Sequence, residues 1–134
     1  MRWAVLMFFL VVGSAHANLS ADGVWRTQAS EDGAYLTVEI GACADNAARV
    51  CGVILDLIDG NGESAESEAV GKYIIQNMRP VDGNDGSWHK GSIWAPDDDK
   101  TYKSKMALVE DGLKVSGCVF GGLICRSQVW QRVE

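Results

Sequence analysis

Residues 91–133 read GSIWAPDDDKTYKSKMALVEDGLKVSGCVFGGLICRSQVWQRV. Runs in which apolar and polar residues alternate are separated by turn-forming residues at Pro96-Asp97, Asp111-Gly112 and Gly121-Gly122. Pro, Asp and Gly suit the backbone angles of tight turns, and a period of two places one row of side chains on each face of a strand. This part of the chain therefore predicts a succession of β-hairpins.

The same pattern continues toward the N-terminus. Alternating runs bounded by turn signals predict strands over residues 23–27, 34–40, 49–57, 87–95, 100–110, 113–120 and 124–133. Residues 72–79 fit either a short strand or a short helical piece. Residues 58–71 are acidic and rich in Gly and Ser, which predicts a long exposed loop with room for one helical turn over residues 64–69. Within residues 87–95, the alternation puts Trp88 and Trp94 on the same face.

About eight short strands without a long helix predict an all-β domain over residues 18–134. An open sheet of this size leaves two edges exposed, whereas an antiparallel up-and-down β-barrel has none. A barrel of about eight strands has room for packed side chains or one small ligand. A barrel is therefore the favoured architecture, and a sandwich of two sheets is the alternative.

Residues 1–17 have the order of a secretory signal peptide. Arg2 is followed by an apolar run over residues 4–12 and by the small-residue cleavage pattern Ala15-His16-Ala17. The apolar run is too short for a membrane span, which needs about 20 residues. We expect cleavage after Ala17 and a periplasmic or secreted chain whose mature form has no membrane span.

The net charge and the cysteines indicate which partners and which covalent links to expect. The formal net charge is −6, and an acidic chain without a basic patch argues against binding of nucleic acid or anionic membrane surfaces. An even number of cysteines in an exported chain favours disulfides. The pairs Cys43–Cys51 and Cys118–Cys125 are preferred because each closes one short loop. The alternative, a zinc site, is disfavoured because the spacings differ from C-x2-4-C knuckles.

Candidate catalytic and metal-binding groups are few. His89 is the single histidine beyond the signal peptide, and no G-x-S-x-G or other nucleophile motif accompanies it. Residues 59–63 (DGNGE) resemble the start of a calcium loop, but Ser64 and Val70 stand where such a loop needs Gly and Glu. The acidic run at residues 97–99 is explained as a surface turn. We therefore expect no enzyme activity, catalytic residue, metal or cofactor.

One face of the strand predicted over residues 100–110 mixes polar and apolar side chains. If this face points inward, it could line a small cavity together with residues from other strands; the candidates are Ile54, Trp88, Trp94, Tyr102, Ser104, Met106 and Leu108. The alternative is that the same residues fill the core and leave no cavity.

The chain also resembles the DUF2147 family of small exported bacterial proteins. The resemblance is carried by Gly23-x-Trp25, Cys51-Gly52, Gly91-x-Ile93, Pro96-Asp97, Lys100-x-Tyr102, Leu113-Lys114-Val115, Gly117-Cys118, the run GGLICRSQ at 121–128 and Trp130-x-Arg132. It implies a lipocalin-like (calycin-type) barrel able to hold a small hydrophobic ligand, and no established activity. The chain departs from the family pattern at Asp99, where a glycine is usual, and at His89-Lys90-Gly91, where paired glycines are usual.

A lipocalin-type barrel also implies a plug at its closed end. Such barrels combine a Gly-x-Trp on the first strand with an arginine near the chain end that covers the indole through a cation–π contact. We predict that Trp25 packs under Arg132, with Arg126 as the second choice. The alternative is that Trp25 and Trp130 are simply core aromatics.

Two functional hypotheses follow. The first is an exported barrel that binds a small hydrophobic molecule, with its entrance opposite the Trp25 plug and near residues 58–71. The second is a disulfide-stapled structural or protein-interaction module of the cell envelope, with a filled core and no ligand.

Overall fold

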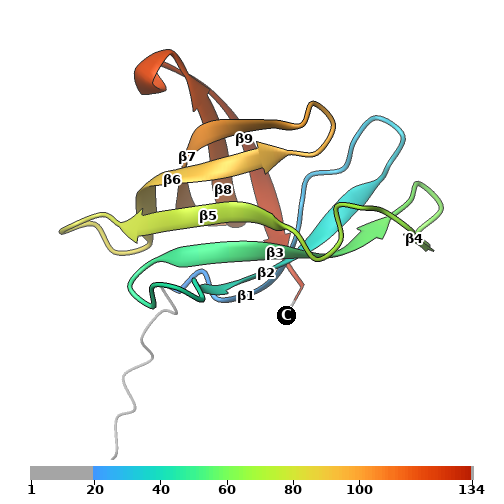
Figure 1. Cartoon of the computed structure of the whole chain (residues 1–134), viewed down its shortest axis with the longest axis horizontal. Helices are drawn as coiled ribbons and strands as arrows, with labels where there is room; N and C mark the ends of the chain where they lie inside the picture. The colour runs from blue at the N-terminus through green and yellow to red at the C-terminus, as the bar shows by residue number, and fades with distance from the viewer. Residues whose placement is uncertain (1–19, 134) are drawn as a thin grey trace, which may run out of the picture.

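The computed structural model describes residues 20–133, so the expected signal peptide lies outside the described residues. Nine strands and one short 3-10 helix occupy the described part of the chain (Figure 1); their bounds are β1 Gly23–Arg26, β2 Tyr35–Ala42, β3 Val50–Ile58, β4 Ser64–Ala65, β5 Tyr73–Pro80, β6 Ser87–Ala95, β7 Lys100–Val109, β8 Gly112–Val119, η1 Phe120–Gly122 and β9 Ile124–Arg132. Within this part, no helix is long and apolar enough to cross a membrane.

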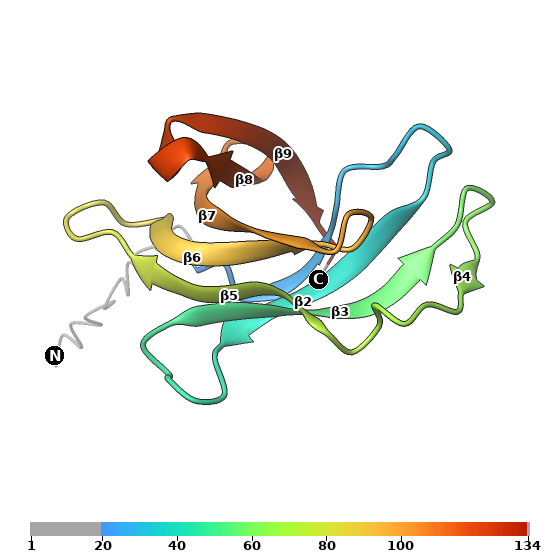
Figure 2. The ribbon, with the colours of Figure 1, turned by 45° about the horizontal axis from the view of Figure 1, so that its top comes forward.

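Eight of the strands form a closed antiparallel barrel. The hydrogen-bonded order is β2-β1-β9-β8-β7-β6-β5-β3, and β2 also pairs with β3, which closes the ring. Figure 2 shows how the sheet curves until its first and last strands meet. Because each strand pairs on both sides, the barrel has no free edge. The predicted all-β barrel is confirmed, and the sandwich alternative is wrong.

The segment between β3 and β5 differs from the expected loop. Ser64 and Ala65 form the two-residue strand β4, which pairs with the end of β3 outside the ring. Residues 68–71 form turns, so the helical turn expected over residues 64–69 is absent. Residues 73–80 are strand β5, which resolves the choice between strand and helix at that position.

A bulge in β6 places its two tryptophans on opposite faces of the strand, contrary to the prediction. The register with β7 shifts between Trp88 and Gly91, so that Trp88 and Ile93 lie opposite residues of the inward-facing row of β7. Trp94 follows Ile93 directly and leaves the strand from the other side. The prediction that Trp88 and Trp94 share a face is therefore wrong, because the extra residue inverts the alternation halfway along the strand.

The two departures from the family pattern coincide with strained backbone. Lys90 has a φ of 58° and Asp99 a φ of 51°, in the left-handed region that favours glycine. The chain thus keeps a glycine-type backbone at these turns with other side chains. Gly91 is constrained differently: a Cβ there would lie 2.6 Å from Met78 Sδ and 2.7 Å from the Gln76 carbonyl oxygen of β5.

The core fills the closed end and middle of the barrel. Its largest fully buried side chains come from six strands: Trp25, Val38, Ile40, Ile54, Ile75, Met78, Leu113 and Trp130. Two disulfides, Cys43–Cys51 and Cys118–Cys125, join residues on adjacent strands or their flanking loop. Both predicted pairings are confirmed, and the described residues include no free cysteine.

Candidate functional site

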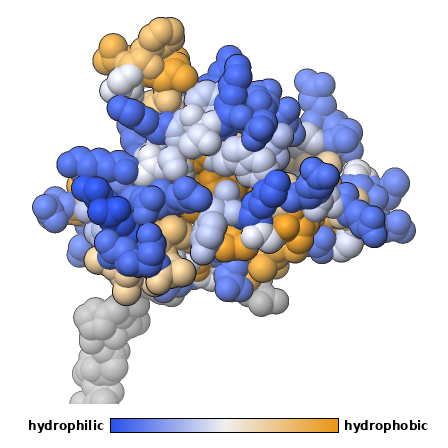
Figure 3. All heavy atoms as spheres, viewed as in Figure 1, coloured by the Kyte–Doolittle hydropathy of each residue, from blue (hydrophilic) through white to orange (hydrophobic). Residues whose placement is uncertain are grey.

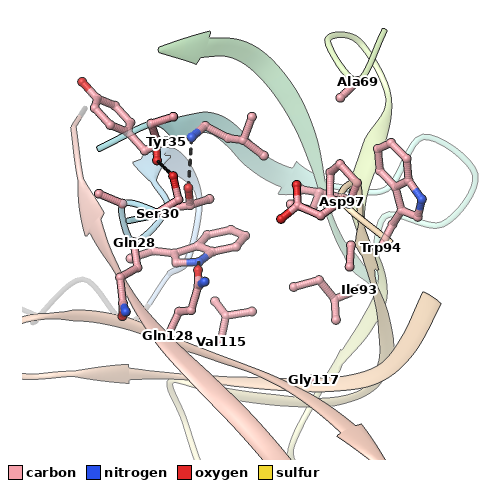
Figure 4. Close-up of a pocket in the computed structure, with 18 of the residues that line it drawn as sticks. Gln28, Ser30, Tyr35, Ala69, Ile93, Trp94, Asp97, Val115, Gly117 and Gln128 are labelled. Carbon is pink, nitrogen blue, oxygen red and sulfur yellow. Dashed lines mark hydrogen bonds between the residues drawn. The ribbon is translucent and has the colours of Figure 1, made fainter. Parts of the chain in front are cut away.

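A cavity of about 580 Å³ opens at the end of the barrel where β1 runs into the β1–β2 loop (Figure 4). The β1–β2 loop, the β4–β5 segment, the β6–β7 turn and the inward faces of β8 and β9 all contribute to its wall. The loops and turns among these are connections at one end of an antiparallel barrel, and Ser67 and Ala69 of the segment after β3 belong to the wall. The cavity therefore lies at the end where an entrance was predicted.

The deep part of the cavity is apolar. Its inner wall consists of inward-facing residues of five strands, namely Leu36, Ile74, Ile93, Val115 and Trp130. Period-two alternation delivers these side chains to the interior. Trp130 is buried, and its Nε1 donates a hydrogen bond to Gln128 Oε1 at 3.1 Å. The deep wall therefore offers a ligand apolar contact, and the Trp130 indole N–H is already hydrogen-bonded within the protein.

The β1–β2 loop is held by its own hydrogen bonds. Thr27 N donates to the Leu36 carbonyl oxygen at 2.9 Å, and Thr27 Oγ1 accepts from Leu36 N at 3.0 Å. Ser30 N donates to the Ala34 carbonyl oxygen at 2.9 Å. A Cβ on Gly60 would lie 2.2 Å from the Asp32 carbonyl oxygen, so the loop after β3 packs tightly against this loop. The cavity rim is thus pre-formed on this side.

Asp32 contributes to the same loop. The hydrogen bond from the Ser30 hydroxyl, followed by that from Ala34 N, lowers the pKa of the Asp32 carboxyl below its ordinary value. The carboxylate is exposed and ionised at neutral pH, and its negative charge lies beside the rim residue Ser30.

Arg126 and Gln128 bring polar groups to the part of the wall formed by β9, the strand that pairs with β1. Both alternate with Trp130 along β9 and share its inward face, and both line the cavity. Within residues 20–133, Arg126 has neither a carboxylate partner nor an aromatic ring beneath it. An unpaired guanidinium therefore stands at the mouth of a largely apolar cavity.

Two of the seven predicted cavity residues line this space. Trp94 is held at the rim, where its Nε1 donates to Asp99 Oδ1 at 2.9 Å and Lys72 Nζ lies 5.5 Å from the ring centroid. Tyr102 lies beside Gly117, where a Cβ would come within 3.7 Å of the tyrosine Cβ. Both residues are at the open ends of their strands.

The structure does not place the other five at the cavity. Ile54, Trp88 and Met106 belong to the buried core, and Leu108 packs against it. Ser104 is buried, and its hydroxyl donates to the Ser116 carbonyl oxygen at 2.6 Å. The alternation along β7 identifies the inward face correctly but says nothing about depth. Residues beyond Tyr102 therefore lie where the core fills the barrel.

The closed end carries the predicted aromatic and arginine pair. The Arg132 guanidinium carbon lies 4.2 Å from the centroid of the Trp25 ring. Trp25 is only 1% exposed, and its Nε1 donates to the Ala21 carbonyl oxygen at 2.8 Å. Arg132 also donates to the carbonyl oxygens of Asp22 at 2.7 Å and Ser20 at 3.1 Å. Arg126, the second choice, lies instead at the open end.

The catalytic and metal-binding candidates from the sequence occupy positions with ordinary structural roles. His89 is a half-buried residue in the β6 bulge, opposite Arg79 of β5. Asp59 Oδ1 accepts hydrogen bonds from the backbone N–H groups of Asn61 and Glu63, which makes the carboxylate part of a turn. Among residues 20–133, no three His, Cys, Asp or Glu side chains come together as a metal site would require.

Most of the cavity wall was not predicted from the sequence. The loop residues Gln28 and Ser30 carry no periodic signal, and their place at the rim depends on how the loop folds. Arg126 and Gln128 could have been found, because they precede Trp130 by four and two residues on the same strand and so share its face.

The comparisons with known proteins agree with this architecture. No functionally curated protein matches the sequence. The structure is similar to that of protein HP1028 from the human pathogen Helicobacter pylori, which is described as belonging to the lipocalin family. The TM-score is 0.66 at 16% sequence identity, over 86% of this chain and 84% of the other. The model of an uncharacterised protein family conserved in bacteria, DUF2147, matches residues 23–132, which shows that this chain belongs to the DUF2147 family.

Proposed function

We propose that this protein is an exported, non-enzymatic carrier that binds one small hydrophobic or amphipathic molecule in the open end of its barrel. The observation that carries the proposal is the cavity of about 580 Å³ with an apolar wall and a sparsely polar rim. Binding sites for small molecules commonly measure about 300–1,000 Å³ and combine an apolar lining with a few polar groups. A core filled to the open end would have favoured the structural module instead.

The chemistry of the wall suggests the orientation of the ligand. Ile74, Ile93 and Val115 offer contact to an apolar body in the deep part of the cavity. Arg126 and Gln128 offer hydrogen-bond donors at the mouth. Because Arg126 has no carboxylate partner within the described residues, an anionic or strongly accepting group at the polar end of the ligand would satisfy it.

Three observations support export. Residues 1–17 have the pattern of a cleavable signal peptide. The two disulfides are compatible with an oxidising compartment outside the cytoplasm. The family to which the chain belongs is bacterial. Periplasmic or secreted location is therefore part of the proposal, and cleavage after Ala17 is its direct test by mass spectrometry.

Ligand binding is tested first on protein purified from the compartment to which a bacterial host exports it. Native mass spectrometry would show a co-purified molecule as an adduct, and titration with anilinonaphthalene sulfonate, an amphipathic anion, would measure the cavity directly. We expect saturable binding of the probe at one site. A chain that carries no adduct and binds no probe would favour the filled-core interaction module.

A matched pair of variants locates the probe. Leu36→Trp adds bulk to a side chain that lines the cavity, whereas Thr37→Trp adds the same bulk to the next residue of β2, outside the cavity lining. We expect the first variant to lose probe binding by tenfold or more and the second to retain it. Arg126→Gln should weaken binding of the anionic probe more than that of a neutral apolar probe. Equal affinities in both tryptophan variants would place the probe elsewhere.

A further inference from the structure

The tip of the β8–β9 hairpin, residues 118–125 (CVFGGLIC), is the most exposed apolar segment of the described chain. Phe120 is 74% exposed, Leu123 87%, Ile124 55% and Val119 38%. Figure 3 shows an apolar projection where Figure 1 draws η1, at the upper left of both views. We call residues 118–125 the β8–β9 tip.

The tip is fixed in shape despite its exposure. Cys118 and Cys125 are opposite each other in the β8–β9 register and are joined by a disulfide. Phe120 has a φ of 53°, which a non-glycine residue adopts at a cost of about 1 kcal/mol or more, and the two glycines that follow also have positive φ. The backbone thus holds a large apolar side chain outward in an unfavourable conformation. Strain of this kind persists where the surrounding structure enforces it, and it is enriched at functional positions.

The tip is too small to be a protein interface by itself. At about 150–200 Å² for each side chain, its exposed fractions amount to roughly 400–500 Å². A stable interface between two proteins needs about 800 Å² on each partner. The tip is also convex and not a groove. A lipid bilayer accepts such a projection without a complementary surface, because insertion requires only apolar area and favourable charge at its base.

The charge at the base of the tip is positive. Although the whole chain has a net charge of −6, residues 112–133 contain no Asp or Glu, and Arg126 follows Cys125 directly at the base of the tip. Strand β7, which pairs with β8, contributes Lys100, Lys103 and Lys105 and no acidic residue. Lys103 lies opposite Cys118 in the register, directly below the tip. The acidic residues of the neighbouring hairpin are confined to the β6–β7 turn, where Asp99 is hydrogen-bonded to Trp94.

We propose that the β8–β9 tip inserts into the surface of a lipid bilayer, with Lys103 and Lys105 next to anionic lipid headgroups. The whole-chain charge argues against attraction to such surfaces, but the acidic residues are absent from the strands that carry the tip. Gly117 and Arg126, the immediate neighbours of the two cysteines, line the cavity. Insertion would therefore bring the cavity mouth close to the lipid. This inference does not depend on the cavity binding a ligand.

The test measures flotation of the exported protein with vesicles of phosphatidylcholine, alone or mixed with phosphatidylglycerol. The N-terminus is first determined by mass spectrometry, so that the apolar residues 4–12 are known to be absent. Phe120→Ser/Leu123→Ser should lower the partition coefficient at least tenfold, or about 1.4 kcal/mol. The matched control Leu55→Ser/Val109→Ser changes two exposed apolar residues of β3 and β7 and should leave partitioning unchanged.

Two further measurements test the contact itself. Phe120→Trp should become quenched by brominated phosphatidylcholine more strongly than the wild-type protein, which reports insertion without loss of apolar character. Lys103→Gln/Lys105→Gln should reduce binding to phosphatidylglycerol vesicles toward the level seen with phosphatidylcholine alone, and added salt should do the same to the wild-type protein.

The inference is overturned if the wild-type protein does not float with either vesicle, or if the tip variant and the control variant partition equally. It is also overturned if sedimentation shows a dimer that Phe120→Ser/Leu123→Ser dissolves while no variant binds vesicles, since the tip would then contact a second copy of the chain. Melting curves of all variants exclude misfolding as the cause of any loss.

Discussion

Arg132→Met should destabilise the barrel by about 2 kcal/mol. The guanidinium lies 4.2 Å from the centroid of the Trp25 ring, which is 1% exposed. A cation over a ring of this kind contributes about 1 kcal/mol, more than at a fully exposed site. The two hydrogen bonds to the carbonyl oxygens of Asp22 and Ser20 contribute roughly 0.5 kcal/mol each. The lower end of the usual range applies because these carbonyls are exposed and water replaces the lost donor.

Urea denaturation followed by tryptophan fluorescence would measure this loss. With a slope of about 2 kcal/mol per molar urea for a domain of this size, the midpoint should fall by about 1 M. Arg132→Lys should lie between the wild-type protein and Arg132→Met, because lysine keeps the charge over the ring but cannot donate to two carbonyls from one planar group.

Arg126→Met is the matched control on the same strand. Arg126 is exposed and makes neither a ring contact nor a side-chain hydrogen bond within the described residues. Its replacement should change the free energy of unfolding by less than about 0.5 kcal/mol. If Arg132→Met unfolds at the wild-type urea concentration, or if Arg126→Met is destabilised to the same extent, the contact between Arg132 and Trp25 does not stabilise the barrel as proposed.

Three other outcomes follow from the packing and the loops. Gly91→Ala should cost about 1–3 kcal/mol in urea denaturation because its Cβ would overlap strand β5, whereas Gly41→Ala, which has no atom within 4 Å, should cost less than about 1 kcal/mol. Replacing Cys43 and Cys51 together by serine should cost about 2–3 kcal/mol through the freed loop, and an unchanged melting temperature would contradict the chain-entropy estimate. The Asp32 carboxyl should titrate in carbon-detected NMR with a midpoint below its ordinary value of 3.8. Any stability that it supplies is therefore present above that pH and is lost as the pH falls through the lowered pKa. A midpoint at or above 3.8 would show that its hydrogen bonds do not form in solution.

The strands, the disulfides and the contact between Arg132 and Trp25 could be predicted from the sequence. Alternating residues between turn signals specify strands locally, because the period of two is a property of the extended backbone. The pairs Cys43–Cys51 and Cys118–Cys125 are close in sequence, so their loops close with little entropy cost in any fold that has these strands. Arg132 over Trp25 followed from the family pattern of the two chain ends.

The position of the cavity and the residues that line it depend on how the whole barrel folds. Alternation says that Tyr102 and Met106 face inward, but the depth at which each lies depends on how the barrel closes, and only Tyr102 reaches the cavity. The bulge after Trp88 changes which residues of β6 face inward. No sequence pattern marks this bulge as clearly as alternation marks a strand. The loop residue Ser30 reaches the rim through long-range contact between the β1–β2 and β3–β4 loops. Such positions are set by packing between segments far apart in the chain, which no local pattern records.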